Sequence, residues 1–360
     1  MILIFTVILV ALIFEYINGF HDTANAIATT VATKALSPRN AIILAAVTNL
    51  IGALIGGAVA KTVSSGIVDA SYVTSGTIIC ALIGGIVWNL LTWWKGLPSS
   101  SSHALIGGLC GATMASAHGN WNSLIWMHDK GGDWWKNDGI LYKIIVPMIS
   151  SPALGLIFGF LIIASLYFIF KKVWEATWLQ KMFSKLQIVS STYMGIAHGS
   201  NDAQKIMGVI ALSLLAATAS GELQHLPMWL DFLRHPLVVA ADGTKNIAVW
   251  IKVLCAIVMA AGTAAGGWKI IHTMGKKLVE LKPVDGFAAE TTGATILLGA
   301  AHFGMPVSTT HAITSSIMGV GLGGKGKSLC FGTAGKILFA WILTLPATFI
   351  IGYCIRKLTM

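Results

Sequence analysis

The nine residues GLPSSSSHA at positions 96–104 return as GMPVSTTHA at positions 304–312, which is 208 residues further along the chain. In both copies a proline precedes a run of hydroxyl side chains, a histidine and then an apolar segment. Proline followed by hydroxyl residues before an apolar run is typical of the first turn of a helix. The repetition therefore predicts two helices that begin in the same way, one in each half of the chain.

Other landmarks repeat in the same order. The segment GFHDT at 19–23 matches GSNDA at 199–203. Glycines that lie between these landmarks are matched as well, namely Gly52, Gly56 and Gly57 with Gly262, Gly266 and Gly267. Matched landmarks in one order predict an internal duplication. We divide the chain into a first transmembrane repeat (1–170), a Lys-rich connector (171–187) and a second transmembrane repeat (188–360).

The composition predicts that most of the chain lies in lipid. Of the 360 residues, 55% are hydrophobic and 11% are charged, which leaves too little charge to cover the surface of a soluble protein. About ten apolar stretches approach the roughly 20 residues that a helix needs to cross a bilayer. They lie at about 1–33, 40–60, 72–94, 99–117, 143–170, 188–217, 247–267, 287–302, 306–322 and 332–355. The predicted fold class is an all-α polytopic membrane protein.

The two repeats are expected to have opposite orientations. Each contains five of the apolar stretches, and an odd number places the second repeat upside down relative to the first. Inverted repeats with interrupted helices are the usual architecture of secondary transporters, whose site lies near the middle of the membrane. We therefore expect two inverted-topology repeats whose first helices break at Gly19 and Gly199, where glycine permits a break that frees backbone carbonyls. A duplicated bundle without transport activity is the alternative.

The distribution of charge argues against a nucleic-acid partner, although the net charge is +10. If each apolar stretch crosses the membrane, one side holds 14 Lys and Arg residues and the other holds nine. Cytoplasmic loops are rich in Lys and Arg, so we expect the connector in the cytoplasm and both termini outside. The expected partner of the apolar surface is membrane lipid.

Only four of the 14 carboxylates lie inside apolar stretches: Glu15, Asp22, Asp202 and Glu290. Ionisable groups inside a span are costly and mark functional sites. Asp22 and Asp202 are related by the repeat, and each stands in a run of polar residues. Carboxylate, amide and free carbonyl oxygens suit a hard cation such as Na⁺, or a proton site. Capping of a half-helix is the structural alternative for each aspartate.

The two hydroxyl runs supply the opposite polarity. A helix N-terminus presents unpaired N–H groups and the positive end of the helix dipole. Two such N-termini facing each other would surround one tetrahedral oxyanion. Four other residues are secondary candidates in this region: His103 and His311, which follow the hydroxyl runs, Lys205, which either holds the anion or pairs with a carboxylate, and Glu15, two helical turns before Asp22.

These motifs resemble the PiT family of inorganic phosphate transporters, especially its bacterial low-affinity branch. The resemblance rests on residues 19–26, residues 198–205 and the two hydroxyl runs, and it covers nearly the whole chain. It implies an inverted-repeat transport fold, a homodimer in the bacterial plasma membrane, and phosphate bound at the midplane between re-entrant hairpins. It implies no enzymatic activity and no cofactor besides a coupling ion.

The resemblance also implies roles for particular residues. Phosphate would be lined by Ser100, Ser101, Ser102, Ser308, Thr309 and Thr310, with Gln204 nearby. The coupling cation or proton would be served by Asp22, Asn25, Asn201 and Asp202, with Na⁺ at Asp22 and Asp202 if Na⁺ is the ion. His21 stands where many members have Asn, which favours the proton-coupled type, similar to carriers of neutral complexes of phosphate with a divalent metal.

Two rival functions follow from the same motifs, besides a channel, whose flux would not be coupled to any gradient. A sulfate permease on the same scaffold is the main alternative, because sulfate is also a tetrahedral oxyanion. A membrane hydrolase would use Ser102 with His103 or Thr310 with His311, but adjacent residues on a helix do not face each other. An acceptor beside the anion favours monohydrogen phosphate, which can donate a hydrogen bond, over sulfate; Asp22 or Asp202 would be that acceptor, but the sequence does not place them, so the choice of anion stays open at this point.

Overall fold

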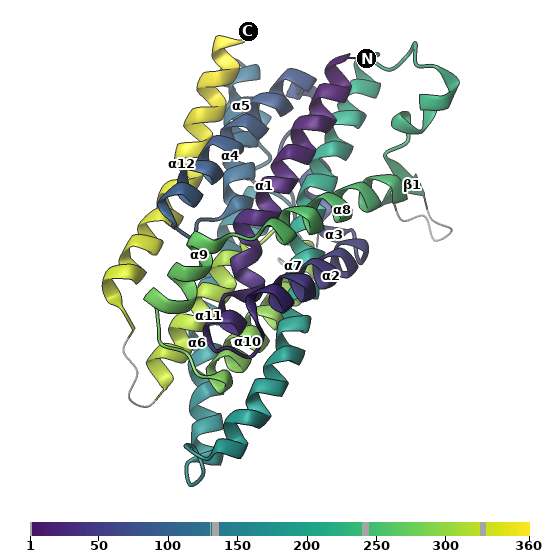
Figure 1. The fold of residues 1–360 in the computed structure, drawn as a ribbon. Coiled ribbons are helices and arrows are strands. Elements are labelled where there is room, and N and C mark those ends of the chain that lie inside the picture. The colour runs from purple at the N-terminus through teal and green to yellow at the C-terminus, as the bar shows by residue number, and fades with distance from the viewer. Residues whose placement is uncertain (1, 130, 132–136, 240–244, 325–328) are drawn as a thin grey trace.

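The computed structural model describes residues 2–129, 131, 137–239, 245–324 and 329–360, and most of them are helical (Figure 1). The α-helices are α1 (Ile2–Ala32), α2 (Pro38–Leu54), α3 (Ala58–Ser65), α4 (Ser75–Lys95), α5 (Ser101–Ser116), α6 (Val146–Phe170), α7 (Thr177–Ala219), α8 (Val249–Ala265), α9 (Trp268–His272), α10 (Pro283–His302), α11 (Thr309–Gly323) and α12 (Phe331–Leu358). The short elements are η1 (Ala70–Tyr72), η2 (Trp121–Ser123), η5 (Met228–Arg234), the π-helices η4 (Leu141–Ile145) and η6 (Thr273–Lys277), and an antiparallel pair of strands β1 (Leu237–Val239) and β2 (Lys245–Ile247).

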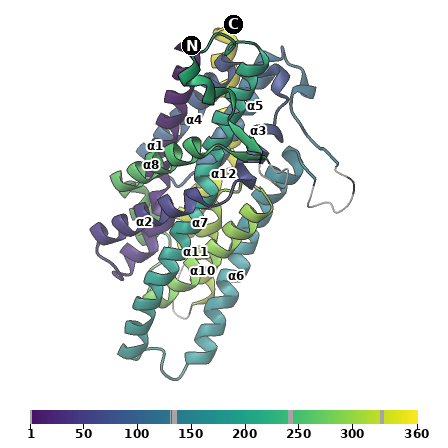
Figure 2. The ribbon, with the colours of Figure 1, turned by 90° about the vertical axis from the view of Figure 1, so that its right-hand side faces the viewer.

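The bundle is elongated, and both chain ends lie at the same end of it (Figures 1 and 2). The turn that joins α6 to α7 lies at the opposite end. Thus α1 and its repeat counterpart α7 start from opposite ends and run in opposite directions, as an inverted repeat requires; the inversion itself stays a prediction. The expected connector at 171–187 is mostly helical, because α7 already begins at Thr177.

The expected interruptions occur one helix later than the sequence suggested. α1 and α7 are continuous through Gly19 and Gly199, so the prediction of breaks there was wrong. The chain breaks instead between α2 and α3, with a bend of 67°, and between α8 and α9, with a bend of 60°. Gly56 and Gly266, which the repeat matches, adopt the positive φ values of 87° and 73° at these breaks, a conformation that glycine reaches without steric cost.

Gly19 and Gly199 serve close packing of helices. A Cβ atom on Gly19 would press against the carbonyl oxygen of Met259 in α8. A Cβ atom on Gly199 would overlap the carbonyl oxygen of Asn49 in α2. The first helix of each repeat therefore packs against the second helix of the other repeat, and the matched glycines allow the two backbones to touch.

The last helices of the repeats are exchanged in the same manner. α6 packs on α10 and α11 of the second repeat, and α12 packs on α4 and α5 of the first. The two halves are thus interlocked and bury their apolar faces against each other.

Both hydroxyl runs start helices, as predicted. The hydroxyl of Ser100 caps α5 by accepting a hydrogen bond from the amide of His103 at 3.1 Å. The hydroxyl of Ser308 does the same for α11, with the amide of His311 at 3.2 Å. α5 and α11 contain 16 and 15 residues, too few to cross a bilayer, as expected for arms of re-entrant hairpins.

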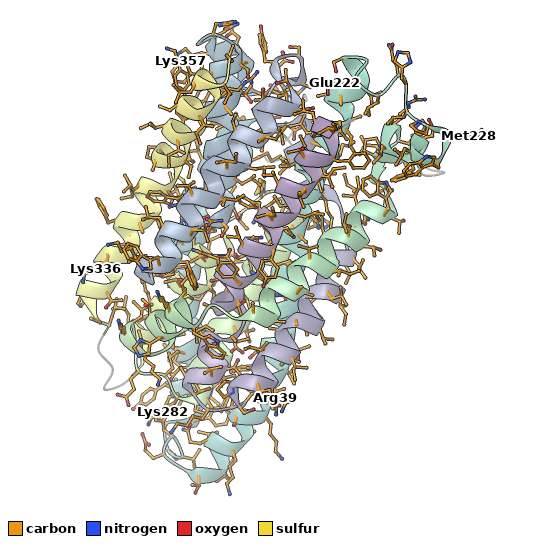
Figure 3. The ribbon with its side chains drawn as sticks, turned by 45° about the horizontal axis from the view of Figure 1, so that its top comes forward. Arg39, Glu222, Met228, Lys282, Lys336 and Lys357 are labelled. Atoms are coloured by element: carbon orange, nitrogen blue, oxygen red, sulfur yellow. The ribbon has the colours of Figure 1, made fainter. Side chains whose placement is uncertain are left out.

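Five of the described helices are long and apolar enough to span a membrane, or seven if each bent pair counts as one span. The chain is therefore a polytopic membrane protein. Figure 3 places Arg39 and Lys282 toward the end of the molecule opposite to Glu222 and Lys357. The sidedness predicted from the Lys and Arg count stays a prediction, and Lys325 and Lys327, which contribute to that count, lie outside the described residues.

The core consists of two apolar clusters with a polar layer between them. In α1 one cluster includes Ile4 to Phe14 and the other begins at Ala24. In α7 the cluster that contains Ala24 extends as far as Ala197, and the cluster that contains Phe14 begins at Ala203. The repeated aspartate motifs fill both gaps, so the polar residues lie halfway along the bundle.

The glycine contacts give a first testable prediction. In Gly52→Ala the new Cβ would overlap the carbonyl oxygen of Ile196 in α7, and since that atom belongs to the backbone, α2 and α7 must move apart. We expect the purified protein to lose about 1–3 kcal/mol of stability, measured by thermal unfolding in detergent. Gly335→Ala in α12 has no atom within 4 Å of the new Cβ and should be neutral or slightly stabilising; equal losses in both variants would contradict the packing role.

Candidate functional site

Two buried carboxylates meet where α1 and α7 pass each other. Asp22 and Asp202 are 2% and 1% exposed. One potential ligand atom from each of Asp22, His198 and Asp202 lies within 4.8 Å of the others. An uncompensated charge in such a place costs several kcal/mol, so the groups around each carboxylate decide what the site can hold.

Asp22 in the first repeat has a histidine partner. The Nδ1 atom of His21 lies 2.6 Å from Oδ1 of Asp22. The other ring nitrogen lies 3.2 Å from the hydroxyl of Thr92 in α4, and the hydroxyl of Ser101 in α5 is 3.4 Å from Nδ1. His21 therefore connects the carboxylate to the N-terminus of α5.

Asp202 in the second repeat has three partners. The ammonium group of Lys205 donates a hydrogen bond to Oδ1 of Asp202. The Nε2 atom of His198 lies 3.1 Å from Oδ2, and the hydroxyl of Thr309 donates to the same oxygen at 2.9 Å. This carboxylate is thus bound to α7 and to the N-terminus of α11 together.

The N-termini of α5 and α11 approach each other next to these carboxylates. The hydroxyl of Ser102 donates to the carbonyl of Val307 at 3.3 Å. The amide of Asn25 donates to the hydroxyls of Thr309 and Thr310 at 3.1 and 3.0 Å. Ser102, Thr309 and Thr310 therefore share one buried polar region with both aspartates, whereas Ser100 and Ser308 use their hydroxyls as helix caps.

Gln204 lies at the break between α2 and α3. Its side-chain oxygen accepts from the backbone amides of Val59 at 3.0 Å and Ala60 at 3.4 Å. Its amide nitrogen donates to the carbonyls of Ile55, at 3.3 Å, and Ser200. In this conformation the side chain stabilises the broken helix pair, and the expectation that Gln204 lines phosphate stays a prediction.

Glu290 belongs to a second polar cluster. Its carboxylate accepts from the hydroxyls of Thr29 at 2.5 Å and Thr30 at 2.9 Å. Gln187 donates to it at 3.2 Å, and Ser190 donates as well. These groups join α1, α7 and α10 about two helical turns beyond Asp22.

Glu15 lies on the other side of Asp22 along α1. The amide of Asn18 donates to Oε2 of Glu15 at 3.5 Å, and among the described residues Oε1 has no hydrogen-bond partner. The Glu15 carboxyl group therefore retains free acceptor capacity inside the bundle.

The repeat-related histidines contact each other. The ring centroids of His103 and His311 are 4.8 Å apart in an edge-to-face arrangement. His311 also stacks on Trp341 of α12 at 4.0 Å, and the indole of Trp341 donates to the carbonyl of Pro98 at 3.0 Å. This pair joins the two hydroxyl-rich helices behind their N-termini.

His198 was missed as a site residue by reasoning from the sequence. Its position inside the polar run HGSNDAQK could have drawn attention to it, but its counterpart in the first repeat is Asn18, so the repeat comparison did not select it. Its Nδ1 atom lies 3.2 Å from the side-chain oxygen of Asn49, which orients the ring toward Asp202. Asn201, by contrast, was expected, and within the described part of the chain both its amide atoms lack hydrogen-bond partners.

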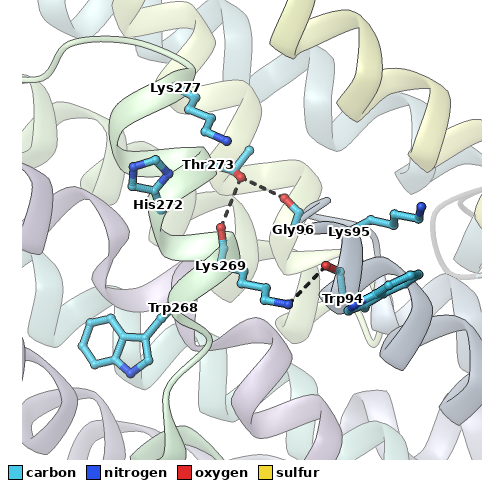
Figure 4. Close-up of a pocket in the computed structure, with 8 residues that line it drawn as sticks. All are labelled: Trp94, Lys95, Gly96, Trp268, Lys269, His272, Thr273 and Lys277. Atoms are coloured by element: carbon cyan, nitrogen blue, oxygen red, sulfur yellow. Dashed lines mark hydrogen bonds between the residues drawn. The ribbon is translucent and has the colours of Figure 1, made fainter.

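A cavity of about 430 Å³ lies beside the turn between α4 and α5 (Figure 4). Its lining residues are Trp94, Lys95, Gly96, Trp268, Lys269, His272, Thr273 and Lys277. Thr273 donates to the carbonyl of Gly96 at 2.8 Å, and Lys269 reaches the carbonyl of Trp94 at 3.4 Å. Lys95, Lys269 and Lys277 form no ion pair among the residues that the structure describes. The lining therefore carries positive charge without a carboxylate partner, and from Gly96 in this lining the chain reaches Ser99 within three residues.

The chemistry of the central site combines two functions. The hydroxyls and the N–H groups of two helix N-termini suit a tetrahedral oxyanion. The carboxylates of Asp22 and Asp202, with the free amide of Asn201, suit a small cation or a proton. The arrangement can therefore hold an anion and a cation side by side.

Comparisons with known proteins agree with this chemistry. The sequence pattern of the phosphate transporter family matches residues 18–352. The chain is 41% identical to a probable low-affinity inorganic phosphate transporter of Bacillus subtilis, over 98% of this chain and 96% of that protein. It is 43% identical to a protein of the same description from Mycobacterium tuberculosis, over 97% of this chain and 76% of that protein.

The fold has a counterpart among solved structures. It matches a structure described as the sodium-dependent phosphate transporter with a TM-score of 0.79, over 100% of this chain and 99% of that one. The sequences are 21% identical, so this likeness concerns the fold alone.

The contacts of Gln204 give a second prediction. Gln204→Leu would leave the amides of Val59 and Ala60 and the carbonyl of Ile55 without their side-chain partner, at a cost of about 1–3 kcal/mol. We expect reduced thermal stability in detergent, compared with Gln224→Leu at an exposed position as the control. Unchanged stability together with a large loss of phosphate affinity would show that Gln204 is a ligand and not a support of the α2–α3 break.

Proposed function

Because the chain belongs to the phosphate transporter family, we propose that it carries inorganic phosphate across the membrane together with a cation, with H⁺ favoured as the coupling ion. As a family member with several membrane-spanning helices, the chain is an integral protein of the bacterial plasma membrane. The family is one of transporters, so we propose no enzymatic activity and no cofactor besides the coupled ion. A homodimer stays a prediction.

One observation carries the proposal. The N-termini of α5 and α11, one from each repeat, approach each other beside Asp202 on α7: Thr309 donates to its carboxylate, and Ser102 contacts Val307 and the ammonium group of Lys205, which pairs with that carboxylate. We assign phosphate to the space bounded by these N-termini, with Ser101, Ser102, Thr309 and Thr310 as its hydroxyl donors. Backbone N–H groups and hydroxyls can bind all oxygens of a tetrahedral anion without an additional positive charge.

Charge accounting explains the need for a cation. A phosphate dianion is costly in a low-dielectric site unless it is neutralised, and Asp22 and Asp202 make the surroundings more negative. Either cations at these carboxylates neutralise the anion, or phosphate enters as a neutral complex with a divalent metal while protons neutralise the aspartates. In both cases the cation and the anion enter together.

The partner of Asp22 supports the choice of H⁺ as the coupling ion. The ring of His21 lies 2.6 Å from the carboxylate and occupies a position where a bound metal ion would need an oxygen ligand. This contact favours a proton over Na⁺ at the first-repeat aspartate, and Na⁺ at Asp22 and Asp202 is the alternative. The fold match to a sodium-dependent transporter does not decide between the ions.

The same carboxylates favour phosphate over sulfate. Monohydrogen phosphate can donate a hydrogen bond, sulfate cannot, and an unpaired acceptor in the site penalises the anion without the proton. Oδ2 of Asp202 accepts from Thr309 next to the proposed anion space, and it becomes an acceptor for the phosphate O–H when Thr309 turns its hydroxyl toward the anion. The sulfate alternative has no support from the relatives described above.

The lysines beside the turn between α4 and α5 fit this proposal. A positive potential at the mouth of a site raises the local concentration of anions. We assign to Lys95, Lys269 and Lys277 the role of attracting phosphate toward the turn that leads to Ser99.

The decisive experiment is uptake of labelled phosphate into proteoliposomes that contain the purified protein. We expect an inward pH gradient to drive accumulation, a Na⁺ gradient at uniform pH to drive little, and excess sulfate to compete poorly. Accumulation that requires Na⁺ would keep the substrate and overturn the choice of ion. Absence of uptake under every gradient would overturn the function.

Neutral substitution of the aspartates tests the site itself. Asp22→Asn and Asp202→Asn should each reduce uptake to the level of empty liposomes, because the first removes the carboxylate that holds the coupling cation and the second removes the carboxylate that positions Lys205 and Thr309. Asp231→Asn, at an aspartate that is 48% exposed and pairs with Arg234, is the matched control and should transport normally. Size-exclusion profiles establish that the variants are folded; normal uptake by either site variant would refute the assignment.

A further inference from the structure

The repeat places an ammonium group where the other half of the molecule has an amide. The offset of 180 residues that aligns Asp22 with Asp202 also aligns Asn25 with Lys205. Asn25 donates to the hydroxyl of Thr310, and Lys205 donates to the hydroxyl of Ser102. Ser102 and Thr310 are themselves aligned by the offset of 208. Asn25 and Lys205 thus make the same contact to the helix N-terminus of the opposite repeat.

Lys205 is surrounded by oxygen atoms. The residue is 3% exposed. Its Nζ atom donates to Oδ1 of Asp202, to the hydroxyl of Ser102 and, at 2.8 Å, to the backbone carbonyl of Val307. A carboxylate, a hydroxyl and a carbonyl are the ligands that a small hard cation takes from a protein.

These three contacts also limit what Lys205 can do. An ammonium group has three N–H donors and no acceptor, and all three have an acceptor within the chain. No donor is left for a phosphate oxygen unless one of these contacts breaks. The position is therefore that of a bound cation and not that of a phosphate ligand.

We propose that Lys205 is a built-in cation that permanently occupies, in the second repeat, the place of a coupling ion at Asp202. The proposal rests on the proposed function, since it concerns the cations that accompany phosphate. Only the first repeat, where the uncharged Asn25 stands beside Asp22, then exchanges an ion with solution. The covalently attached charge makes the two halves of a duplicated site unequal and reduces the number of ions that must be taken up with each phosphate.

Removal of the ammonium group should create a site for a free ion. In Lys205→Asn the carboxylate of Asp202, the carbonyl of Val307 and the hydroxyl of Ser102 remain, and the new amide resembles Asn25. We expect this variant to bind Na⁺ at least about tenfold more tightly than the wild-type protein. The measurement is binding of ²²Na⁺ to purified protein in detergent, in choline chloride and without phosphate, together with thermal stabilisation by Na⁺.

Two controls separate a new ion site from a general effect of losing a lysine. Lys205→Asn combined with Asp202→Asn keeps the space but removes the carboxylate, and should lose the added Na⁺ affinity. Lys143→Asn removes another buried lysine, whose ammonium donates to the carbonyl of Phe303 at 2.9 Å, and should bind Na⁺ like the wild type. Equal Na⁺ affinity in Lys205→Asn and the wild type would overturn the proposal.

A second measurement leaves Lys205 in place and applies even if Lys205→Asn does not fold. In Asp22→Asn only the second-repeat carboxylate remains, and we expect no specific Na⁺ binding. Binding that persists in Asp22→Asn and disappears in the Asp22→Asn, Asp202→Asn double variant would put a mobile ion at Asp202 beside Lys205, and would refute the inference. Because these assays contain no phosphate, their outcome is independent of whether the wild-type protein transports phosphate.

Discussion

A carboxylate in the middle of a membrane-spanning helix has to be compensated by its neighbours, and this constraint organises the whole molecule. Asp22 and Asp202 lie between two apolar clusters, where water does not solvate them. Their partners come from α1, α7 and the N-terminus of α11, and His21 and Lys205 connect them to the N-terminus of α5. Those four helices must therefore converge at half the depth of the bundle.

Helices can converge this closely only where glycine stands at the crossing points. Gly19 and Gly199 allow α1 and α7 to touch α8 and α2 with their backbones. Side chains there would overlap the backbones of α8 and α2 and push the helices that carry the carboxylates away from their neighbours. Gly19 and Gly199 lie on the same helices as Asp22 and Asp202. Their close contacts with α8 and α2 thus help to fix the position of the carboxylates.

The membrane-spanning class and the starts of α5 and α11 could be predicted from the sequence, because each depends on local pattern. The position of the helix breaks could not. A glycine that permits a break and a glycine that permits close packing look alike in a sequence, and only the partner helix distinguishes Gly19 from Gly56. His198 and Gln204 depend in the same way on contacts with Asn49 and with the α2–α3 break, which lie about 150 residues away in the chain.

The contacts between the two halves differ in strength, and this difference bears on how a central site can open. The glycine contacts of α1 with α8 and of α2 with α7 are continuous backbone packing. The contacts between the hydroxyl-rich helices are few and polar, such as Ser102 with Val307 and His103 with His311. Each is worth about 1 kcal/mol, so separating α5 from α11 costs far less than separating the glycine-packed pairs. Because α5 is also glycine-packed on α12 and α11 on α6, access to the buried carboxylates is most economical when each short helix moves together with its long partner helix.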